Sequence, residues 1–357
     1  MNPLSRTRLP IGVIYALAAA TLFGASTPLS KLLLGSVDPW LLAGLLYLGS
    51  GCGLSLWLLL ASRLTGKDSK EASLKRADLP CLAGAILFGG VVGPVLLMLG
   101  LASTPAASAS LLLNLEGVLT ALLAWFVFKE NFDRRIALGM ALITGGGVLL
   151  SWSGDTAAGV PWGAVGIAGS CLAWGIDNNL TRKVSGENPI QIAAAKGLVA
   201  GSVNLTLALF IGSHLPSVPT VLAAGAVGLL GYGVSLACFV LALRHLGTAR
   251  TGAYFSLAPF VGAAFSLVIF QEGLSILLGV AAALMGVGVW LHLTEKHEHQ
   301  HQHEPMEHDH GHVHDEHHQH EHSPDDPPGE PHSHTHRHEA LTHSHAHYPD
   351  LHHRHEH

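Results

Sequence analysis

Charged residues are scarce in this chain of 357 residues. Lys, Arg, Asp and Glu together make up 12% of the sequence, whereas hydrophobic residues make up 49%. A soluble globular protein usually carries about 25% charged residues. The shortage therefore excludes an ordinary two-domain cytosolic enzyme.

Cysteine is rare too, and several functional motifs are missing. The four cysteines lie in four different apolar stretches, so we expect small membrane residues and no disulfide framework. No GxxxxGK[ST] motif is present, which argues against direct coupling to ATP. No nucleophile, base and acid motif appears either, so we expect no enzyme activity. The absence of a basic stripe with interleaved aromatic residues argues against nucleic acid as a partner.

Histidine is abundant but very unevenly placed. Of the 26 histidines, only His214, His245 and His292 precede residue 297. The remaining 23 fall in the last 61 residues. The charge divides at the same place, because the body (1–296) has a formal charge of +5 and the tail (297–357) one of -11. The sequence therefore predicts two parts of different character.

The body contains ten apolar stretches of about 18–27 residues, each close to the roughly 20 residues that cross a bilayer as a helix. Backbone polar groups in lipid must be satisfied internally, so the spans are expected to be helices. The sequence thus predicts an all-α integral membrane protein with the lipid bilayer as its partner. The spans are roughly 11–31, 39–62, 79–101, 104–128, 136–153, 160–181, 189–213, 217–243, 249–270 and 273–294.

The first apolar stretch also resembles a signal peptide, since basic residues precede it. Its length and the nine stretches that follow favour an uncleaved helix. With the N-terminus inside, 15 of the body's 17 Lys and Arg residues fall in inside segments, the exceptions being Lys31 and Lys196. This bias predicts a multi-pass protein of the inner (plasma) membrane with both termini cytoplasmic.

The body shows an internal repeat. Leu101–Glu130 aligns without a gap on Leu243–Glu272, an offset of 142, and the copies end in Phe-Lys-Glu and Phe-Gln-Glu. Each copy has five predicted spans, and an odd number places the copies in opposite orientations. Inverted repeats are typical of secondary transporters, with the substrate site near the bilayer midplane. We therefore predict two inverted five-helix repeats, 1–155 and 156–296, followed by the tail.

The segment from Ala109 to Glu130, ASLLLNLEGVLTALLAWFVFKE, resembles the signature of EamA-type proteins of the drug/metabolite transporter superfamily. Tyr254–Glu272 resembles the second copy of that signature. The resemblance covers about residues 10–294 and implies ten helices in two five-helix repeats. It also implies transport of a small-molecule solute, commonly by export.

A few polar residues inside the spans are candidates for a substrate or proton pathway, because ionisable groups in a membrane usually face a partner or a cavity. Glu116 is a candidate proton or amine site, or else a packing residue bonded to Asn114. Asp177 and Lys196 have matching depths and are expected to pair, as a gate or as a structural ion pair. Four further candidates could line the path or only pack between helices, namely Asn178, Asn179, Tyr47 and Tyr254.

In the tail, histidine alternates with other residues, and apolar residues are few, so we expect a disordered chain when it is empty. Imidazoles two residues apart suit Zn, Ni, Co or Cu, and acidic neighbours attract such cations. A pH sensor and a segment without a role are the alternatives. The candidate metal ligands are His297, His299, His301, His303, His308, His310, His312, His314, His317, His318, His320, His322, His332, His334, His336, His338, His343, His345 and His347.

Three functions follow from these features. The first is a secondary transporter that exports a small metabolite, needs no cofactor, and has a tail that binds divalent metal ions and regulates transport. The second is a transporter of divalent metal or of a metal–metallophore complex. The third is a membrane-anchored metal sensor or buffer. Whether the chain forms a homodimer stays open at this stage.

Overall fold

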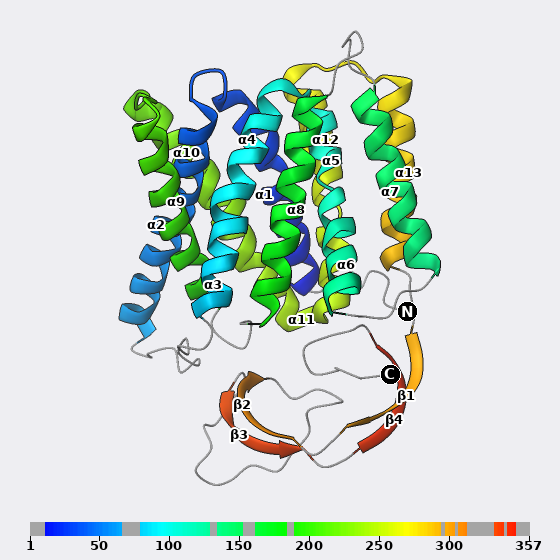
Figure 1. Ribbon diagram of the computed structural model, residues 1–357. Helices are drawn as coiled ribbons and strands as arrows, with labels where there is room; N and C mark the ends of the chain where they lie inside the picture. The colour runs from blue at the N-terminus through cyan, green and yellow to red at the C-terminus, as the bar shows by residue number, and fades with distance from the viewer. Residues whose placement is uncertain are drawn as a thin grey trace, which may run out of the picture.

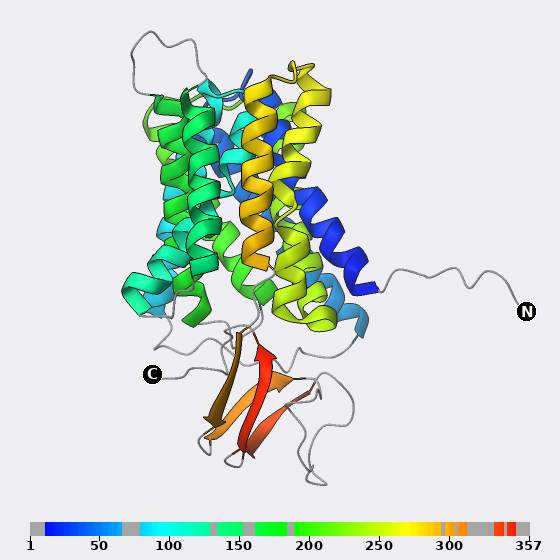
Figure 2. The same ribbon diagram turned by 90° about the vertical axis from the view of Figure 1, so that its right-hand side faces the viewer.

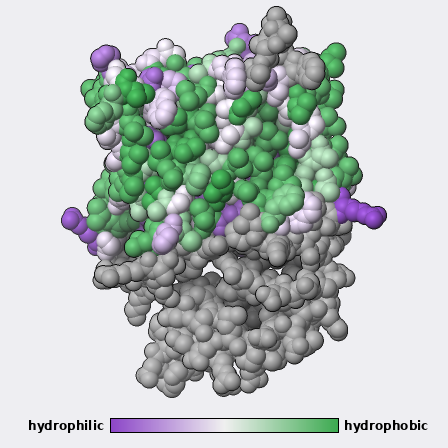
Figure 3. Space-filling model, viewed as in Figure 1, coloured by the Kyte–Doolittle hydropathy of each residue, from purple (hydrophilic) through white to green (hydrophobic). Residues whose placement is uncertain are grey.

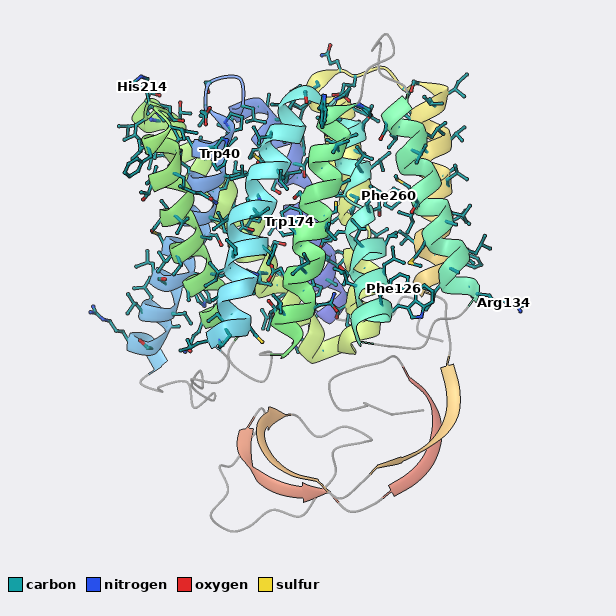
Figure 4. The ribbon with its side chains drawn as sticks, in the orientation of Figure 1. Trp40, Phe126, Arg134, Trp174, His214 and Phe260 are labelled. Atoms are coloured by element: carbon teal, nitrogen blue, oxygen red, sulfur yellow. The ribbon has the colours of Figure 1, made fainter. Side chains whose placement is uncertain are left out.

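The computed structural model describes residues 11–65, 79–128, 134–152, 161–183, 189–293, 297–303, 306–312, 332–338 and 341–347. The body is a bundle of roughly parallel and antiparallel helices (Figure 1). We call the end of the bundle where the first helix begins the near end, and the opposite end the far end. Arg134 lies at the near end and His214 at the far end (Figure 4).

The first repeat contributes five crossings of the bundle. Two of them are interrupted, one by a π-helical segment and the other by a break between two helices. In order, the elements are α1 (Ile11–Leu33), α2 (Pro39–Thr65), α3 (Leu79–Ala85) with η2 (Ile86–Val92) and α4 (Gly93–Ser103), α5 (Ala106–Leu112) with α6 (Leu115–Phe128), and α7 (Arg134–Trp152).

The second repeat has the same plan. Its elements are α8 (Trp162–Lys183), α9 (Pro189–Phe210), α10 (Val218–Gly228) with η3 (Leu229–Val234) and α11 (Ser235–Phe255), α12 (Ala258–Phe270), and α13 (Ile276–Leu293). Together the two repeats make ten crossings, which confirms the predicted all-α membrane fold.

Seven of these crossings are long and apolar enough to span a membrane by length and composition alone. Two more, Ala258–Phe270 and Ile276–Leu291, are apolar but shorter. The tenth is α8, which contains the consecutive polar residues Asp177, Asn178 and Asn179. The least apolar crossing is therefore the one that brings polar groups into the interior.

The face of the bundle seen in Figure 3 is apolar over most of its height, with hydrophilic residues near the two ends. Large side chains such as Phe210, Val268 and Ile276 are 86%, 78% and 88% exposed. Such exposure would be costly in water but suits the hydrocarbon region of a bilayer. All four cysteines are free, as the sequence analysis expected.

The repeat relationship extends to the irregularities of the helices. At the offset of 142, η2 corresponds to residues 228–234, and η3 spans 229–234. The break between α5 and α6 at Leu113–Asn114 corresponds to residues 255–256, where α11 ends. Two independent interruptions at equivalent positions show that both repeats share one backbone design.

The repeats also meet through equivalent helices. α2 packs along α9 (Figure 1), and α7 packs along α13 (Figure 2). The close approach of α2 and α9 depends on glycine, because a Cβ atom on Gly51 would lie 2.4 Å from the backbone nitrogen of Leu198. Small residues at such crossings let membrane helices pack backbone to backbone.

One predicted loop is helical instead. The apolar pattern predicts a loop between the spans 217–243 and 249–270, with His245 in it. In the structure α11 continues to Phe255, and His245 stacks on Tyr15 of α1 with ring centroids 5.9 Å apart. Gly247 is the only residue in this stretch with a low helix propensity, and a single glycine costs about 1 kcal/mol, which does not end a helix.

The tail contains four strands, whereas its composition predicted a disordered chain. They are β1 (His297–His303), β2 (Met306–His312), β3 (His332–His338) and β4 (Leu341–His347). β1 pairs antiparallel with β4, and β2 with β3, outside the helical bundle. Strict alternation has the period of a β-strand, and pairing satisfies backbone groups that a lone chain would leave to water.

Candidate functional site

An ion pair joins α8 to α9 inside the bundle. The Lys196 ammonium donates to the Asp177 carboxylate, whose side chain is only 9% exposed. The Thr181 hydroxyl donates to the other carboxylate oxygen over 2.9 Å. A charge buried this deeply needs such partners, because desolvation makes an unpaired charge costly. The two residues that the sequence analysis expected to pair are thus in contact.

The second carboxylate, that of Glu116, lies near the first turn of α6 and bonds to α8. Asn178 donates its side-chain amide to Glu116 over 2.9 Å and to the Thr120 hydroxyl over 3.4 Å. Asn178 is exposed, whereas Glu116 is half-buried. The interaction therefore ties the break in the first repeat to a helix of the second repeat.

Asn114 is not the partner of Glu116, which corrects the local pairing considered from sequence. Its amide donates to the Leu111 carbonyl over 2.9 Å, and the Met285 sulfur lies 3.9 Å away. The residue sits where α5 ends, and its backbone N–H donates to the same Leu111 carbonyl over 3.0 Å, so the side chain adds a second bond to a carbonyl at the end of the helix. Asn114 therefore stabilises the helix break.

Asn179 also bridges helices. Its amide donates to the Gly175 carbonyl over 2.8 Å in its own helix and to the Thr120 carbonyl over 3.3 Å in α6. The side chain is 7% exposed. Of the two readings considered from sequence, the geometry matches that of an interhelical hydrogen-bonding residue.

The π-helical segment η2 is held by side chains that the sequence analysis largely missed. Tyr47 and Trp174 both donate to the Gly89 carbonyl, over 2.8 and 3.0 Å. Asn204 donates to the neighbouring Gly90 carbonyl over 3.0 Å. Only Tyr47 was among the candidates. Trp174 lies midway between the two ends of the bundle (Figure 4), where a buried indole needs an acceptor.

Glycine lets this segment touch the ion pair. A Cβ atom on Gly89 would lie 1.8 Å from a carboxylate oxygen of Asp177. No side chain fits there unless Asp177 moves. The residues around this contact make up what we call the polar cluster, namely Tyr47, Gly89, Glu116, Thr120, Trp174, Asp177, Asn178, Lys196 and Asn204.

A series of aromatic rings extends from the polar cluster toward the start of α12. Tyr47 and Tyr232 have centroids 5.5 Å apart, and Tyr232 and Phe23 have centroids 5.9 Å apart. Phe23 continues to Phe255 at 5.4 Å. Tyr254, the last of the candidates, is half-buried on α11 and precedes Phe255 of this series in the chain.

The charges of the polar cluster do not cancel. It contains the two carboxylates of Glu116 and Asp177 but only one ammonium, that of Lys196. One negative charge is therefore left over when both carboxylates are ionised. Inside a membrane such a charge is expensive, so it attracts a proton or a cationic group.

The candidate metal ligands lie apart from the polar cluster. In the strands, the register sets histidine opposite histidine at His297↔His347, His299↔His345, His301↔His343, His308↔His336, His310↔His334 and His312↔His332. Within the part of the chain whose side chains are described, no group of three or more His, Cys, Asp or Glu residues could hold a metal ion. Five further ligands lie outside the described residues, namely His314, His317, His318, His320 and His322.

Comparison with known proteins shows that the body matches a known protein family. The sequence model of the EamA-like transporter family matches residues 10–152 and 161–294. A transporter of Methanothermobacter thermautotrophicus is 30% identical over 295 residues, which cover 78% of this chain and 85% of that protein. The Escherichia coli inner membrane transporter YedA is 24% identical, over 76% of this chain and 86% of its own length.

The fold is also similar to that of a solved crystal structure. The two chains superpose with a TM-score of 0.58 at 19% sequence identity, over 79% of this chain and 95% of the other. At this identity the likeness concerns the fold alone. The sequence and structural comparisons therefore agree over the helical body.

Proposed function

The chain belongs to the EamA-like transporter family, and from this membership we propose that it exports a small metabolite through the polar cluster. It is a multi-pass membrane transporter and not an enzyme. The unbalanced charge of the polar cluster is the observation that carries the proposal. Glu116 is the proposed carrier of a proton or the partner of a substrate amine.

The position of the polar cluster supports this assignment. It lies where α6 begins after a helix break and where η2 interrupts α3 and α4. Interrupted helices in transporters expose backbone groups beside the substrate, near the membrane midplane. Asn178 of the polar cluster is exposed although it lies within a membrane crossing, so a solute could reach Glu116 from that side.

Comparing the solutes of cells with and without the protein would test the export proposal. We expect the concentration of one or a few small metabolites to be lower inside the cells that produce the protein and higher in their medium. Glu116→Gln, at equal membrane abundance, should abolish the difference, because it removes the carboxylate of the polar cluster that has no ion-pair partner. Equal metabolite profiles for producing and empty cells would refute export.

We also propose that the tail binds divalent metal and regulates transport from the cytoplasmic side of the inner membrane. Aligned histidines on paired strands support this, because directly opposite residues lie only about 4.5–5.5 Å apart at Cα. Deleting residues 297–357 should leave membrane insertion intact and remove binding of Zn²⁺ or Ni²⁺ to the purified protein. If the protein lacking residues 297–357 bound as much metal as the full chain, this role of the tail would be refuted.

A further inference from the structure

The far end of the first repeat contains a sharp corner between α4 and α5. α4 ends at Ser103, Thr104 is extended, and Pro105 precedes α5. Carbonyl groups at the end of one helix and N–H groups at the start of the next are left without partners inside their helices. The corner therefore needs side chains from elsewhere.

Lys31 of α1 satisfies the carbonyl side of the corner. Its ammonium donates to the carbonyl oxygens of Leu101, Ala102 and Thr104, over 2.5, 3.0 and 3.1 Å. An ammonium group has three N–H donors, and all three are used here. This accounts for one of the two basic residues that depart from the positive-inside pattern.

Glu272 satisfies the N–H side of the corner, from the other repeat. Its two carboxylate oxygens accept from the backbone nitrogens of Ala106 and Ala107, over 2.9 and 3.1 Å. Glu272 is the last residue of the Phe-Gln-Glu ending that the repeat comparison singled out. The contact is therefore one between repeats, at a position that the sequence motif marks.

The backbone beside Glu272 is strained. Gln271 ends α12 with φ 52°, the only positive φ among the described residues other than glycine. A left-handed conformation is costly for a residue with a Cβ atom and persists when its surroundings enforce it. Here it turns the chain at the end of α12 so that Glu272 reaches the first turn of α5.

The corner is also packed against α8. A Cβ atom on Gly100 would lie 2.6 Å from the Gly163 carbonyl oxygen, and one on Gly163 would lie 2.3 Å from the Thr104 hydroxyl. Further along α8, Cys171 is fully buried, and its thiol lies 3.8 Å from the Leu112 carbonyl of α5. Because α5 begins at the corner, displacement of α5 would uncover this side of Cys171.

We propose that Lys31 and Glu272 form a clamp that holds the far end of the transporter closed. The inference rests on the transporter role and not on the proposed substrate or on the proton. Glu272 belongs to the second repeat and bonds α5 of the first, so a motion of one repeat against the other at this end must break the Glu272 bonds. Lys31 holds the same corner from within the first repeat. Opening at the far end requires the clamp to release α4 and α5.

Cys171 provides a native reporter of the clamp. With Cys52, Cys81 and Cys238 replaced by alanine, a membrane-impermeant thiol reagent is added to whole cells and to inside-out vesicles. A separate His214→Cys protein shows which face the far end occupies. Lys31→Met or Glu272→Gln should raise the labelling rate of Cys171 from that face about tenfold, since hydrogen bonds to charged groups contribute enough for such a shift.

Controls separate the clamp from a general loss of structure. His214→Ala, an exposed change at the same end, should leave the labelling rate unaltered. Lys31→Arg keeps N–H donors at this position, so its Cys171 labelling rate should stay close to that of the parent protein. Unchanged labelling in both Lys31→Met and Glu272→Gln would overturn the proposal, and so would a rise from both faces accompanied by a lower melting temperature.

Exchange of the two charges distinguishes a clamp from a simple ion pair. In Lys31→Glu with Glu272→Lys, a carboxylate would face carbonyl groups and an ammonium would face N–H groups. Neither can bond there, because a carboxylate only accepts and an ammonium only donates. Labelling should therefore stay high in the exchanged protein, and restored protection of Cys171 would contradict the clamp.

Discussion

At the scale of single residues, the polar cluster combines one satisfied ion pair with one carboxylate that lacks a basic partner. Asp177 is matched by Lys196, whereas Glu116 is bonded to the neutral amide of Asn178. The first arrangement stabilises the interior of the bundle. The second leaves a group whose charge can change during transport without breaking an ion pair.

The ion pair predicts a non-additive response to mutation. Asp177→Asn should leave the Lys196 ammonium without its counter-charge, and removing one partner of a buried pair costs about 3–5 kcal/mol. Adding Lys196→Met should recover much of that loss, because both charges are then gone. Melting temperatures of the three proteins in detergent test this, and equal effects of the single and double variants would contradict it.

Gly89 predicts a steric response at the same place. Gly89→Ala would put a Cβ atom 1.8 Å from the Asp177 carboxylate, so the ion pair must shift. Overpacking of this kind costs about 1–3 kcal/mol. Gly145→Ala is the matched control, since a Cβ atom there meets nothing within 4 Å. If the melting temperature fell equally in both variants, the predicted steric conflict at Gly89 would be contradicted.

At the scale of elements, irregular helices position the polar cluster. The segments η2 and η3 and the breaks that precede α6 and α12 recur at equivalent places in the two repeats. The repeats differ in what they place there, since Glu116 corresponds to Ala258 at the offset of 142. At the same helix break, the first repeat therefore has a carboxylate where the second repeat has a methyl group.

The shared acceptor in η2 predicts cooperation between Tyr47 and Trp174. Tyr47→Phe alone should cost about 0.5–1.5 kcal/mol, because Trp174 still donates to the Gly89 carbonyl. Tyr47→Phe together with Trp174→Phe leaves that carbonyl without a side-chain donor and should cost more than the sum of the single changes. A double-mutant cycle of stability measures the coupling, and strict additivity would count against the shared acceptor.

The sequence predicted elements far better than their interruptions. Ten apolar stretches and the 142-residue offset were enough to predict the fold, because a membrane-spanning helix can be recognised from the length and composition of its apolar stretch. The π-helical segments were not predicted, since Gly89 and Gly90 look like ordinary packing glycines. Trp174 and Asn204 were missed because their role depends on carbonyls of η2 that are distant in sequence.

The candidate site was predicted in part for a similar reason. Charged residues inside spans stand out, so Glu116, Asp177 and Lys196 were found, and matching depths suggested the ion pair. Depth does not reveal which neighbour a side chain faces, so Asn178 was not assigned to Glu116. Lys31 appeared only as an exception to a charge rule, although it bonds three carbonyls.

At the scale of the whole molecule, two inverted repeats enclose a central polar cluster, and contacts between repeats hold it together. α2 with α9 and α7 with α13 join the repeats along their length. Glu272 joins them at the far end through its bonds to α5, and Glu116 and Asn178 join them within the membrane. A motion of one repeat against the other would change the surroundings of Glu116, which suits alternating access.

The central claim is that Glu116 carries the charge that couples export to its driving force. Inside-out membrane vesicles that contain the wild-type protein or the Glu116→Gln variant are incubated with the exported solute, with and without an imposed pH gradient. The amount of solute that accumulates in the vesicles is then measured. We expect the gradient to stimulate accumulation by the wild type and to have no effect on the variant. Equal stimulation of the wild type and Glu116→Gln would contradict it.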